Sequence, residues 1–265
     1  VRALQPLHIA QDVSHCNEGH AAFLGLERIR NLVLRRRLTF AEALEVVRSS
    51  SLFTTHTPVP AGHDAFPEAM VRQYLSHYPG ELGIDWAQFI GLGRVDPEDP
   101  NEKFSMSVLA CNLSQEVNGV SWLHGEVSKE ILGNLWPGYF KNELHIGYVT
   151  NGVHFPTWTA MRLRRLYARY FPEGFEGHEY RISEWKKVYD IPDEDLWRER
   201  LVLKEKLVRM IRRRYCDPGH VRMDSPHQVM QVLEGIRPDV LKIGFARRFA
   251  TYKRALLLFT DLDRL

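Results

Sequence analysis

The alternation of short apolar runs with helical segments constrains the fold of this chain more than any other feature. Three runs are candidate strands: SLFTTH at 51–56, LHIGYVT at 144–150 and DVLKIGF at 239–245. Between the runs, apolar residues recur at helical spacing, as Ala22, Leu26 and Ile29 do. Short strands that alternate with helices pair most readily as a parallel sheet covered by helices. The sequence therefore predicts an α/β fold.

The run at 239–245 also marks the best candidate for a domain boundary. It is almost continuously apolar, which is typical of a strand buried in a parallel sheet, and Arg237 and Pro238 precede it. A helix capped by Thr251 is expected to follow. We therefore expect residues 1–237 to belong to one domain, and residues 238–265 to be the first strand and helix of a second, truncated one.

Charge and cysteine usage exclude several classes of protein. The chain has 35 Lys and Arg against 33 Asp and Glu, a formal net charge of +2, which does not suggest a nucleic-acid-binding protein. Its three cysteines form no CxxC pair and no disulfide framework, which favours a reducing, cytoplasmic location. There is no apolar run of membrane-spanning length and no signal peptide, so no membrane partner is expected. The chain starts with Val1 and stops inside an apolar pattern, as a piece of a longer protein would.

A cluster of cations surrounds the expected start of the last helix. Arg247 and Arg248 lie in the turn before it, and Lys253 and Arg254 lie in its first turn. Cations at a helix N-terminus are unfavourable by roughly 0.3–1 kcal/mol each. The arrangement is explained if an anion such as phosphate binds there, held by free backbone N–H groups and by the cationic side chains. The alternative is a set of surface charges paired with distant acids.

A second group of polar residues follows another candidate strand, DVSHC at 12–16. Asn17, Glu18 and His20 lie between that strand and the next helix. A metal site from His15, Glu18 and His20 is one alternative, but the spacing matches no standard ligand pattern, so we expect no metal. The other two are a helix cap formed by Asn17 or Glu18, and polar groups lining a substrate cleft.

Three further histidines lie where a strand gives way to a loop or helix. His56 and His63 occur in a Pro- and Gly-rich loop after the strand at 51–56, and such loops often carry function. GVSWLH at 119–124 is a candidate short strand, with His124 at the entry to the helix after it. By position alone, His124 is equally a cap or a ligand-binding residue.

The sequence as a whole resembles the α-glucan phosphorylases, that is, the glycogen and maltodextrin phosphorylase family, and in particular its shorter bacterial and archaeal branch. The resemblance rests on five stretches in family order: HCNEGHAAFLGLERIR, FTTHTPVPAGHDAFP, NGVSWLHGEVSKEI, HIGYVTNGVHFPTW and GFARRFATYKRA. They are spread along essentially the whole chain. The family has the GT-B architecture, in which two Rossmann-like domains face each other across a cleft. The resemblance thus implies the later part of the first domain and the start of the second.

The resemblance implies a glycosyltransferase of carbohydrate metabolism. Family members carry out reversible phosphorolysis of α-1,4-glucans, in which inorganic phosphate takes the non-reducing terminal glucosyl unit and gives α-glucose 1-phosphate, and they carry pyridoxal phosphate. The resemblance assigns Arg248 and Lys253 to the substrate phosphate and Arg247 to the cofactor phosphate. His124 is assigned to the reacting glucosyl unit, where it helps to stabilise positive charge at the anomeric carbon. Asn17, Glu18, His20 and His56 match motifs near the cleft without definite roles.

One departure limits the resemblance. The family's cofactor lysine lies in a Gly-rich motif that would fall beyond Leu265, so this chain is expected to be inactive alone. Regulation by phosphorylation or by nucleotides is not expected. The resemblance is compatible with a full-length parent that forms a homo-oligomer. Two alternatives stay open: a nucleotide-sugar GT-B glycosyltransferase similar to glycogen synthase, and a non-catalytic glucan-binding module that stacks sugars on Trp122, Trp136 and Trp158.

Overall fold

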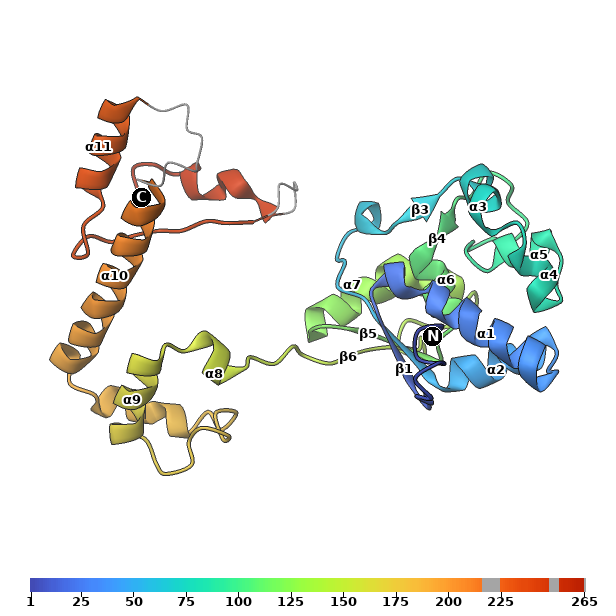
Figure 1. The fold of residues 1–265 in the computed structure, drawn as a ribbon, viewed down its shortest axis with the longest axis horizontal. Coiled ribbons are helices and arrows are strands. Elements are labelled where there is room, and N and C mark those ends of the chain that lie inside the picture. The colour runs from blue at the N-terminus through green and yellow to red at the C-terminus, as the bar shows by residue number, and fades with distance from the viewer. Residues whose placement is uncertain (216–224, 248–252, 265) are drawn as a thin grey trace. The chain divides into compact units, whose positions relative to one another are not determined.

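The computed structural model describes residues 1–215, 225–247 and 253–264, and Figure 1 shows the order of its elements. The chain divides into two compact units, Val1–Gly152 and Val153–Leu265. Each unit has its own hydrophobic core and is described by itself.

Unit 1 is built on a four-stranded parallel sheet. Its strands, in spatial order, are β1 (Ser14–Asn17), β2 (Ser51–Thr54), β5 (Glu116–Gly119) and β6 (Ile146–Tyr148). The register aligns Cys16, Phe53, Val117 and Ile146 in one row across the sheet, and all four side chains are buried. The α/β prediction is therefore confirmed. Because every strand runs the same way, Asn17, Thr54 and Gly119 end at one edge of the sheet.

The connection from β1 to β2 follows the sequence prediction closely. It contains η1 (Gly19–Ala21), α1 (Phe23–Arg36) and α2 (Phe40–Ser49). The predicted apolar stripe on α1 is buried: Ala22, Leu26 and Ile29 are each at most 3% exposed. A capping box starts α2, in which the Thr39 hydroxyl accepts the Glu42 N–H and the Glu42 carboxylate accepts the Thr39 N–H.

The connection from β2 to β5 is longer and holds more structure than the sequence indicates. Its elements are η2 (Pro60–Gly62), β3 (Ala65–Phe66), α3 (Glu68–Leu75), α4 (Tyr78–Leu82), α5 (Trp86–Gly91), β4 (Phe104–Ser105) and α6 (Met106–Asn112). β3 and β4 form a separate antiparallel pair. Almost all of α6 is buried, so it anchors this connection in the core.

Helix α7 (Trp122–Leu132) corrects one prediction. Residues 119–124 were expected to form a strand, but β5 ends at Gly119 and the helix begins at Trp122, followed by η3 (Gly133–Leu135). Ser121 explains the difference, because its side-chain oxygen accepts the His124 N–H at 3.2 Å and so caps the helix. His124 therefore lies in the first turn of α7.

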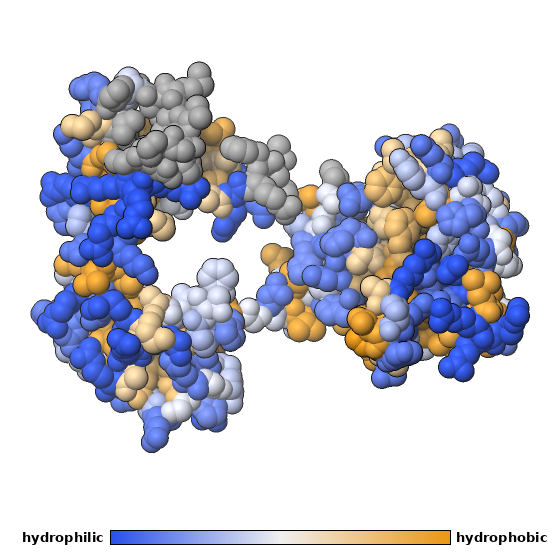
Figure 2. Space-filling model, viewed as in Figure 1, coloured by the Kyte–Doolittle hydropathy of each residue, from blue (hydrophilic) through white to orange (hydrophobic). Residues whose placement is uncertain are grey.

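Unit 2 is helical over the residues that the structure describes. It contains α8 (Phe155–Trp158), α9 (Met161–Tyr170), η4 (Glu184–Asp190), α10 (Asp193–Tyr215), α11 (Pro226–Gly235) and η6 (Ala255–Phe259). Its core contains Phe155, Phe171 and Phe175 together with neighbouring apolar residues. The rings of Phe171 and Phe175 pack edge to face, with their centroids 4.4 Å apart. Figure 2 shows hydrophilic residues over much of the visible surface, and within the described ranges no helix is long and apolar enough to cross a membrane.

The predicted strand at 239–245 is wrong as far as the structure describes the chain. Residues 241–247 have no regular secondary structure, and residues 255–259 form a 3₁₀ helix in place of the predicted α-helix. A strand needs a neighbouring strand for its backbone hydrogen bonds. The described residues of unit 2 form no strand that could pair with it. The expected cap Thr251 lies outside the described residues, and the division into 1–237 and 238–265 stays a prediction.

Candidate functional site

A chain of hydrogen bonds links three strands at the carboxyl edge of the sheet. The Thr54 hydroxyl donates to Oδ1 of Asn118 at 2.7 Å, and the Asn118 amide donates to the Gly119 carbonyl at 3.1 Å. Nε2 of His15 lies 2.6 Å from the same hydroxyl oxygen of Thr54. Since that hydroxyl gives its only hydrogen to Asn118, His15 is the donor. These bonds fix the positions of the strand ends on which the other site residues stand.

Glu18 follows β1 in an unusual backbone conformation, with φ 70° and ψ 160°. Its N–H donates to the Thr54 carbonyl at 2.9 Å, which holds the turn against β2. Its carboxylate accepts the backbone N–H of His56 and, at 3.2 Å, the hydroxyl of Thr57. It also accepts the N–H of Gly19 at 3.4 Å, as the predicted cap would, although for η1 rather than for α1. Glu18 is thus used mainly to hold the loop after β2.

Asn17 and His56 form an exposed pair at the ends of β1 and β2. Nε2 of His56 lies 2.6 Å from Oδ1 of Asn17, so the ring nitrogen donates to the amide oxygen. A neutral His56 ring then presents Nδ1 as an acceptor, and Asn17 presents its amide N–H groups as donors. The pair offers uncharged hydrogen-bonding groups at the sheet edge.

His124 is 8% exposed, and the tautomer of its ring is fixed by the backbone. The Val120 N–H donates to Nδ1 at 3.1 Å, so Nδ1 carries no hydrogen and Nε2 carries the one of the neutral ring. Nε2 is buried and has no hydrogen-bond partner within the described part of the chain. Gly119 makes this approach possible, because a Cβ there would lie 2.9 Å from Nδ1 of His124. The Nε2–H group of His124 is therefore a donor that remains available to a ligand beside the end of β5.

His20 does not join this network. It lies exposed in η1, separate from the bonds that occupy Glu18 and His15. Within the described residues there is no group of three His, Cys, Asp or Glu side chains arranged to hold a metal ion. Burial and the nearby Glu18 raise the pKa of the Cys16 thiol to about 11, so the thiol is not a nucleophile at neutral pH.

The cationic segment belongs to unit 2 and is only partly described. Arg247 is exposed, and its Nη1 donates to the Ala246 carbonyl at 3.2 Å. Lys253 is half-buried and has an interaction partner of its own. Arg248 lies outside the described residues. The prediction that these three side chains bind an anion therefore stays a prediction.

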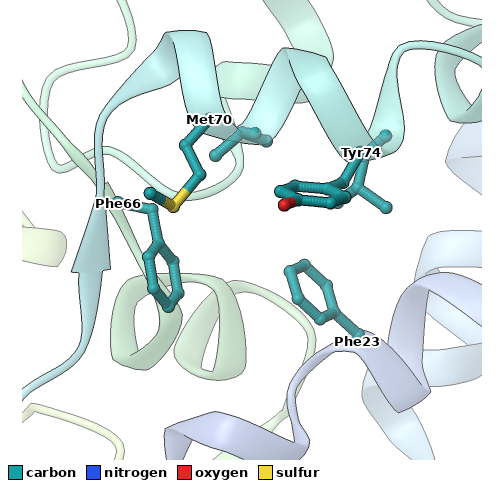
Figure 3. A pocket seen from close by; sticks show the side chains of 6 residues that line it. Phe23, Phe66, Met70 and Tyr74 are labelled. Carbon is teal, nitrogen blue, oxygen red and sulfur yellow. The ribbon is translucent and has the colours of Figure 1, made fainter.

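Unit 1 also has an apolar pocket of about 290 Å³ that is not part of this edge. Figure 3 shows Phe23 of α1 facing Tyr74 of α3, with Phe66 and Met70 on the other side of the hollow. Such a lining lacks the convergent polar groups that orient a ligand for chemistry. The polar edge is therefore the better candidate site.

Sequence reasoning missed several members of the site. Thr54 was not singled out, although it lies near the end of the apolar run at 51–56, and that position was the available signal. Asn118 follows a single apolar residue, Val117, so no local pattern marked it as the end of a strand. His63 was noticed without a role. Nδ1 of His63 lies 2.6 Å from the hydroxyl of Ser107, a buried residue of α6 that no local sequence pattern connects with it.

Known proteins similar to this chain are phosphorylases. The chain is 40% identical over 267 aligned residues to a glycogen phosphorylase of Mycobacterium tuberculosis, which covers 96% of this chain and 29% of that protein. It is also 40% identical to a maltodextrin phosphorylase of Thermococcus litoralis, over 100% of this chain and 30% of the relative. A glycogen phosphorylase of Aquifex aeolicus is 40% identical over 99% of this chain and 37% of the relative.

No family model matches the chain. The chain spans about a third of the length of the curated relatives it matches. Within that span the similarity extends over nearly every residue, including all the stretches on which the resemblance was based. Over nearly its whole length, the chain is therefore homologous to about a third of the glycogen and maltodextrin phosphorylases.

Proposed function

We propose that this chain supplies the sugar-binding edge of an α-glucan phosphorylase, which splits the non-reducing end of α-1,4-glucans with phosphate to give α-glucose 1-phosphate. The observation that carries the proposal is the buried, unpartnered Nε2 of His124 in the described residues. A buried donor without a partner is costly, by about 1–3 kcal/mol. A ligand that accepts its hydrogen bond offsets that cost.

The chemistry of the edge suits a sugar better than an anion. His124 and Asn17 offer neutral N–H donors, and His56 offers a neutral acceptor. The one carboxylate, that of Glu18, is occupied by the loop after β2. Sugar hydroxyls both donate and accept, so a mixed set of uncharged groups can bind them without a charge to compensate. In this proposal Nε2 of His124 donates to a hydroxyl of the reacting glucosyl unit.

The same geometry restricts the role of His124. Because Nε2 carries a hydrogen in the neutral ring, it has no lone pair there to stabilise positive charge at the anomeric carbon. The tautomer therefore supports positioning of the glucosyl unit by His124. Stabilisation of the developing charge has to come from other groups of the complete enzyme.

We assign Arg248 and Lys253 to the substrate phosphate and Arg247 to the phosphate of the cofactor. Cations around one turn can bind phosphate because a bidentate Arg fork and a Lys point charge match its oxygens. Pyridoxal phosphate, when bound in the complete enzyme, supplies a phosphate group for proton transfer beside the substrate phosphate. One exposed guanidinium at Arg247 does not make a pocket for that group, so its site in this chain stays a prediction.

The domain organisation follows the same proposal. Residues 1–237 would be the later part of the first GT-B domain, and residues 238–265 would start the second. The parallel sheet of unit 1 supports a Rossmann-like first domain, in which ligands bind beyond the carboxyl ends of the strands. The site residues described above stand at those ends.

The experiment is a rate measurement on the complete polypeptide that the gene encodes. We expect glucose 1-phosphate to form from maltoheptaose and inorganic phosphate, with the absorbance of bound pyridoxal phosphate in the purified protein. The 265-residue chain alone, assayed beside it, is expected to be inactive. Glucan extension from a nucleotide sugar in place of phosphorolysis, or glucan binding without any turnover, would overturn the proposal.

A further inference from the structure

The loop from Thr55 to Asp64 is fastened across the carboxyl edge of the sheet at both of its ends. At its start, the Glu18 carboxylate accepts the backbone N–H of His56 and the hydroxyl of Thr57. At its far end, Nδ1 of His63 lies 2.6 Å from the Ser107 hydroxyl oxygen. Polar side chains make the hydrogen bonds at both ends, and these bonds hold the loop in place without an apolar core of its own.

The anchoring residues are themselves rigidly placed. Glu18 adopts φ 70° and ψ 160°, a region that is essentially restricted to glycine and persists only where the surroundings enforce it. Ser107 is 2% exposed, and a Cβ on Gly19 would lie 3.0 Å from its side-chain oxygen. Gly19 and Ser107 therefore touch, which brings the turn after β1, helix α6 and the His63 ring together.

The His63 ring shares one property with His124. Nε2 of His63 is buried and lacks a hydrogen-bond partner among the residues the structure describes, as Nε2 of His124 does. Burial lowers the pKa of His63, Glu18 and Asp64 oppose that shift, and His124 adds to it. The lowered pKa favours the neutral form of the ring. A buried, unpartnered polar nitrogen in a native protein calls for an explanation.

We propose that His63 is a second ligand-binding imidazole of this site, whose Nε2 hydrogen-bonds a hydroxyl of the α-glucan beside the unit that His124 contacts. The inference rests on the proposed function. The Ser107 hydroxyl can donate to Nδ1 or accept from it, so Nε2 of His63 can be an acceptor or a donor. A sugar hydroxyl is the ligand group that satisfies either state. The side chain of His63 is partly exposed, although its Nε2 atom is buried.

The test is His63→Asn in the complete polypeptide. The Asn amide reaches the position of Nδ1 and keeps the bond to Ser107, but it removes the group at Nε2. We expect the Kd for maltoheptaose, measured by calorimetry, and the KM for maltoheptaose to rise about 3- to 10-fold, the loss of one uncharged hydrogen bond. The KM for phosphate should stay unchanged. The melting temperature should equal or exceed that of the wild type, because an unpartnered buried nitrogen has been removed.

Two further variants serve as controls. His63→Gln places an amide group near the position of Nε2 and should recover part of the glucan affinity. His8→Asn changes an exposed histidine with φ 56°, a conformation that Asn tolerates, and should leave binding and melting unchanged.

The outcomes separate this inference from the proposed function. An unchanged Kd for maltoheptaose in His63→Asn, or a lower melting temperature that accounts for the whole loss, would show that His63 is only structural. If the wild type binds maltoheptaose but does not phosphorolyse it, the proposed reaction fails while the Kd comparison still decides the role of His63. A wild-type protein that does not bind maltoheptaose overturns both.

Discussion

The fixed tautomer of His124 allows the proposed sugar contact to be tested with two complementary substitutions. The Val120 N–H donates to Nδ1 at 3.1 Å, and the opposite nitrogen has no partner in the described chain. His124→Asn places an amide oxygen near the Nδ1 position and removes the group at Nε2. His124→Gln places an amide nitrogen near the Nε2 position and leaves the Val120 N–H without its acceptor. One variant loses the ligand contact and the other loses the internal one.

The structure sets the expected size of each effect. A hydrogen bond to an uncharged group is worth about 0.5–1.5 kcal/mol net, and about 1.4 kcal/mol is tenfold in rate. We therefore expect His124→Asn to lower kcat/KM for the glucan about 3- to 10-fold. Most of the loss should appear in kcat, because the resemblance places this histidine against the reacting unit. Its free energy of unfolding should change little, since Asn and His have similar helix propensities.

His124→Gln is expected to behave in the opposite way. Leaving a partly buried N–H unsatisfied costs about 1–3 kcal/mol of the free energy of unfolding, while the donor at the ligand end is kept. The assay is the initial rate of glucose 1-phosphate formation by the complete polypeptide at saturating phosphate, with a thermal melt of each variant. Wild-type kcat in His124→Asn, or a loss of kcat confined to a fully folded His124→Gln, would refute the argument.

Two further predictions concern charge. Glu68 receives hydrogen bonds from Arg72 and Trp86 and pairs with Arg94, which is 5% exposed, and these bonds lower the pKa of Glu68 to about 2. The ionised carboxylate thus stabilises the fold fully above pH 4.5 and less as the pH falls toward 2. Glu68→Gln should therefore lower the free energy of unfolding by about 1–3 kcal/mol at pH 7. In denaturant titrations, the free energies of unfolding of the variant and the wild type should converge near pH 2. In the complete polypeptide, Arg248→Leu and Lys253→Met should each raise the KM for phosphate and cost about 2–4 kcal/mol of transition-state stabilisation. Neither should lower the melting temperature. Wild-type phosphate kinetics in these variants would contradict the anion site.

The elements that the sequence predicted well are those whose signal is local. The stripe of Ala22, Leu26 and Ile29 is buried as its spacing indicates, and the Thr39 capping box starts α2. The acids in the first turn of α10 and the arginines in its last are also local signals that the sequence displays. In each case the deciding interactions lie within a few residues of one another.

Predictions that depended on distant partners were less successful. The apolar run at 239–245 is typical of a buried strand, but a strand also needs a neighbour, and the described part of unit 2 offers none. The predicted strand at 119–124 is an exception, because the signal that was missed there, the Ser121 side chain that caps α7, is local. The bond between Thr54 and Asn118 joins residues that are 64 positions apart, so only the order of the strands brings them together. Register and capping decided these outcomes.

Under the proposed function, the division of chemistry between the two parts of the chain follows from what phosphorolysis demands. A glucosyl unit is uncharged, and the groups at the sheet edge of unit 1 that are free to meet it are neutral donors and acceptors. Phosphate is an anion, and the segment assigned to it contains Arg247, Arg248 and Lys253. Cations placed at the sheet edge would bind phosphate where the sugar belongs, and neutral groups in the cationic segment would leave the phosphate charge uncompensated. Under the proposed function the two sets of groups therefore bind different ligands, and the variants of His124 on one side and of Arg248 and Lys253 on the other test them separately.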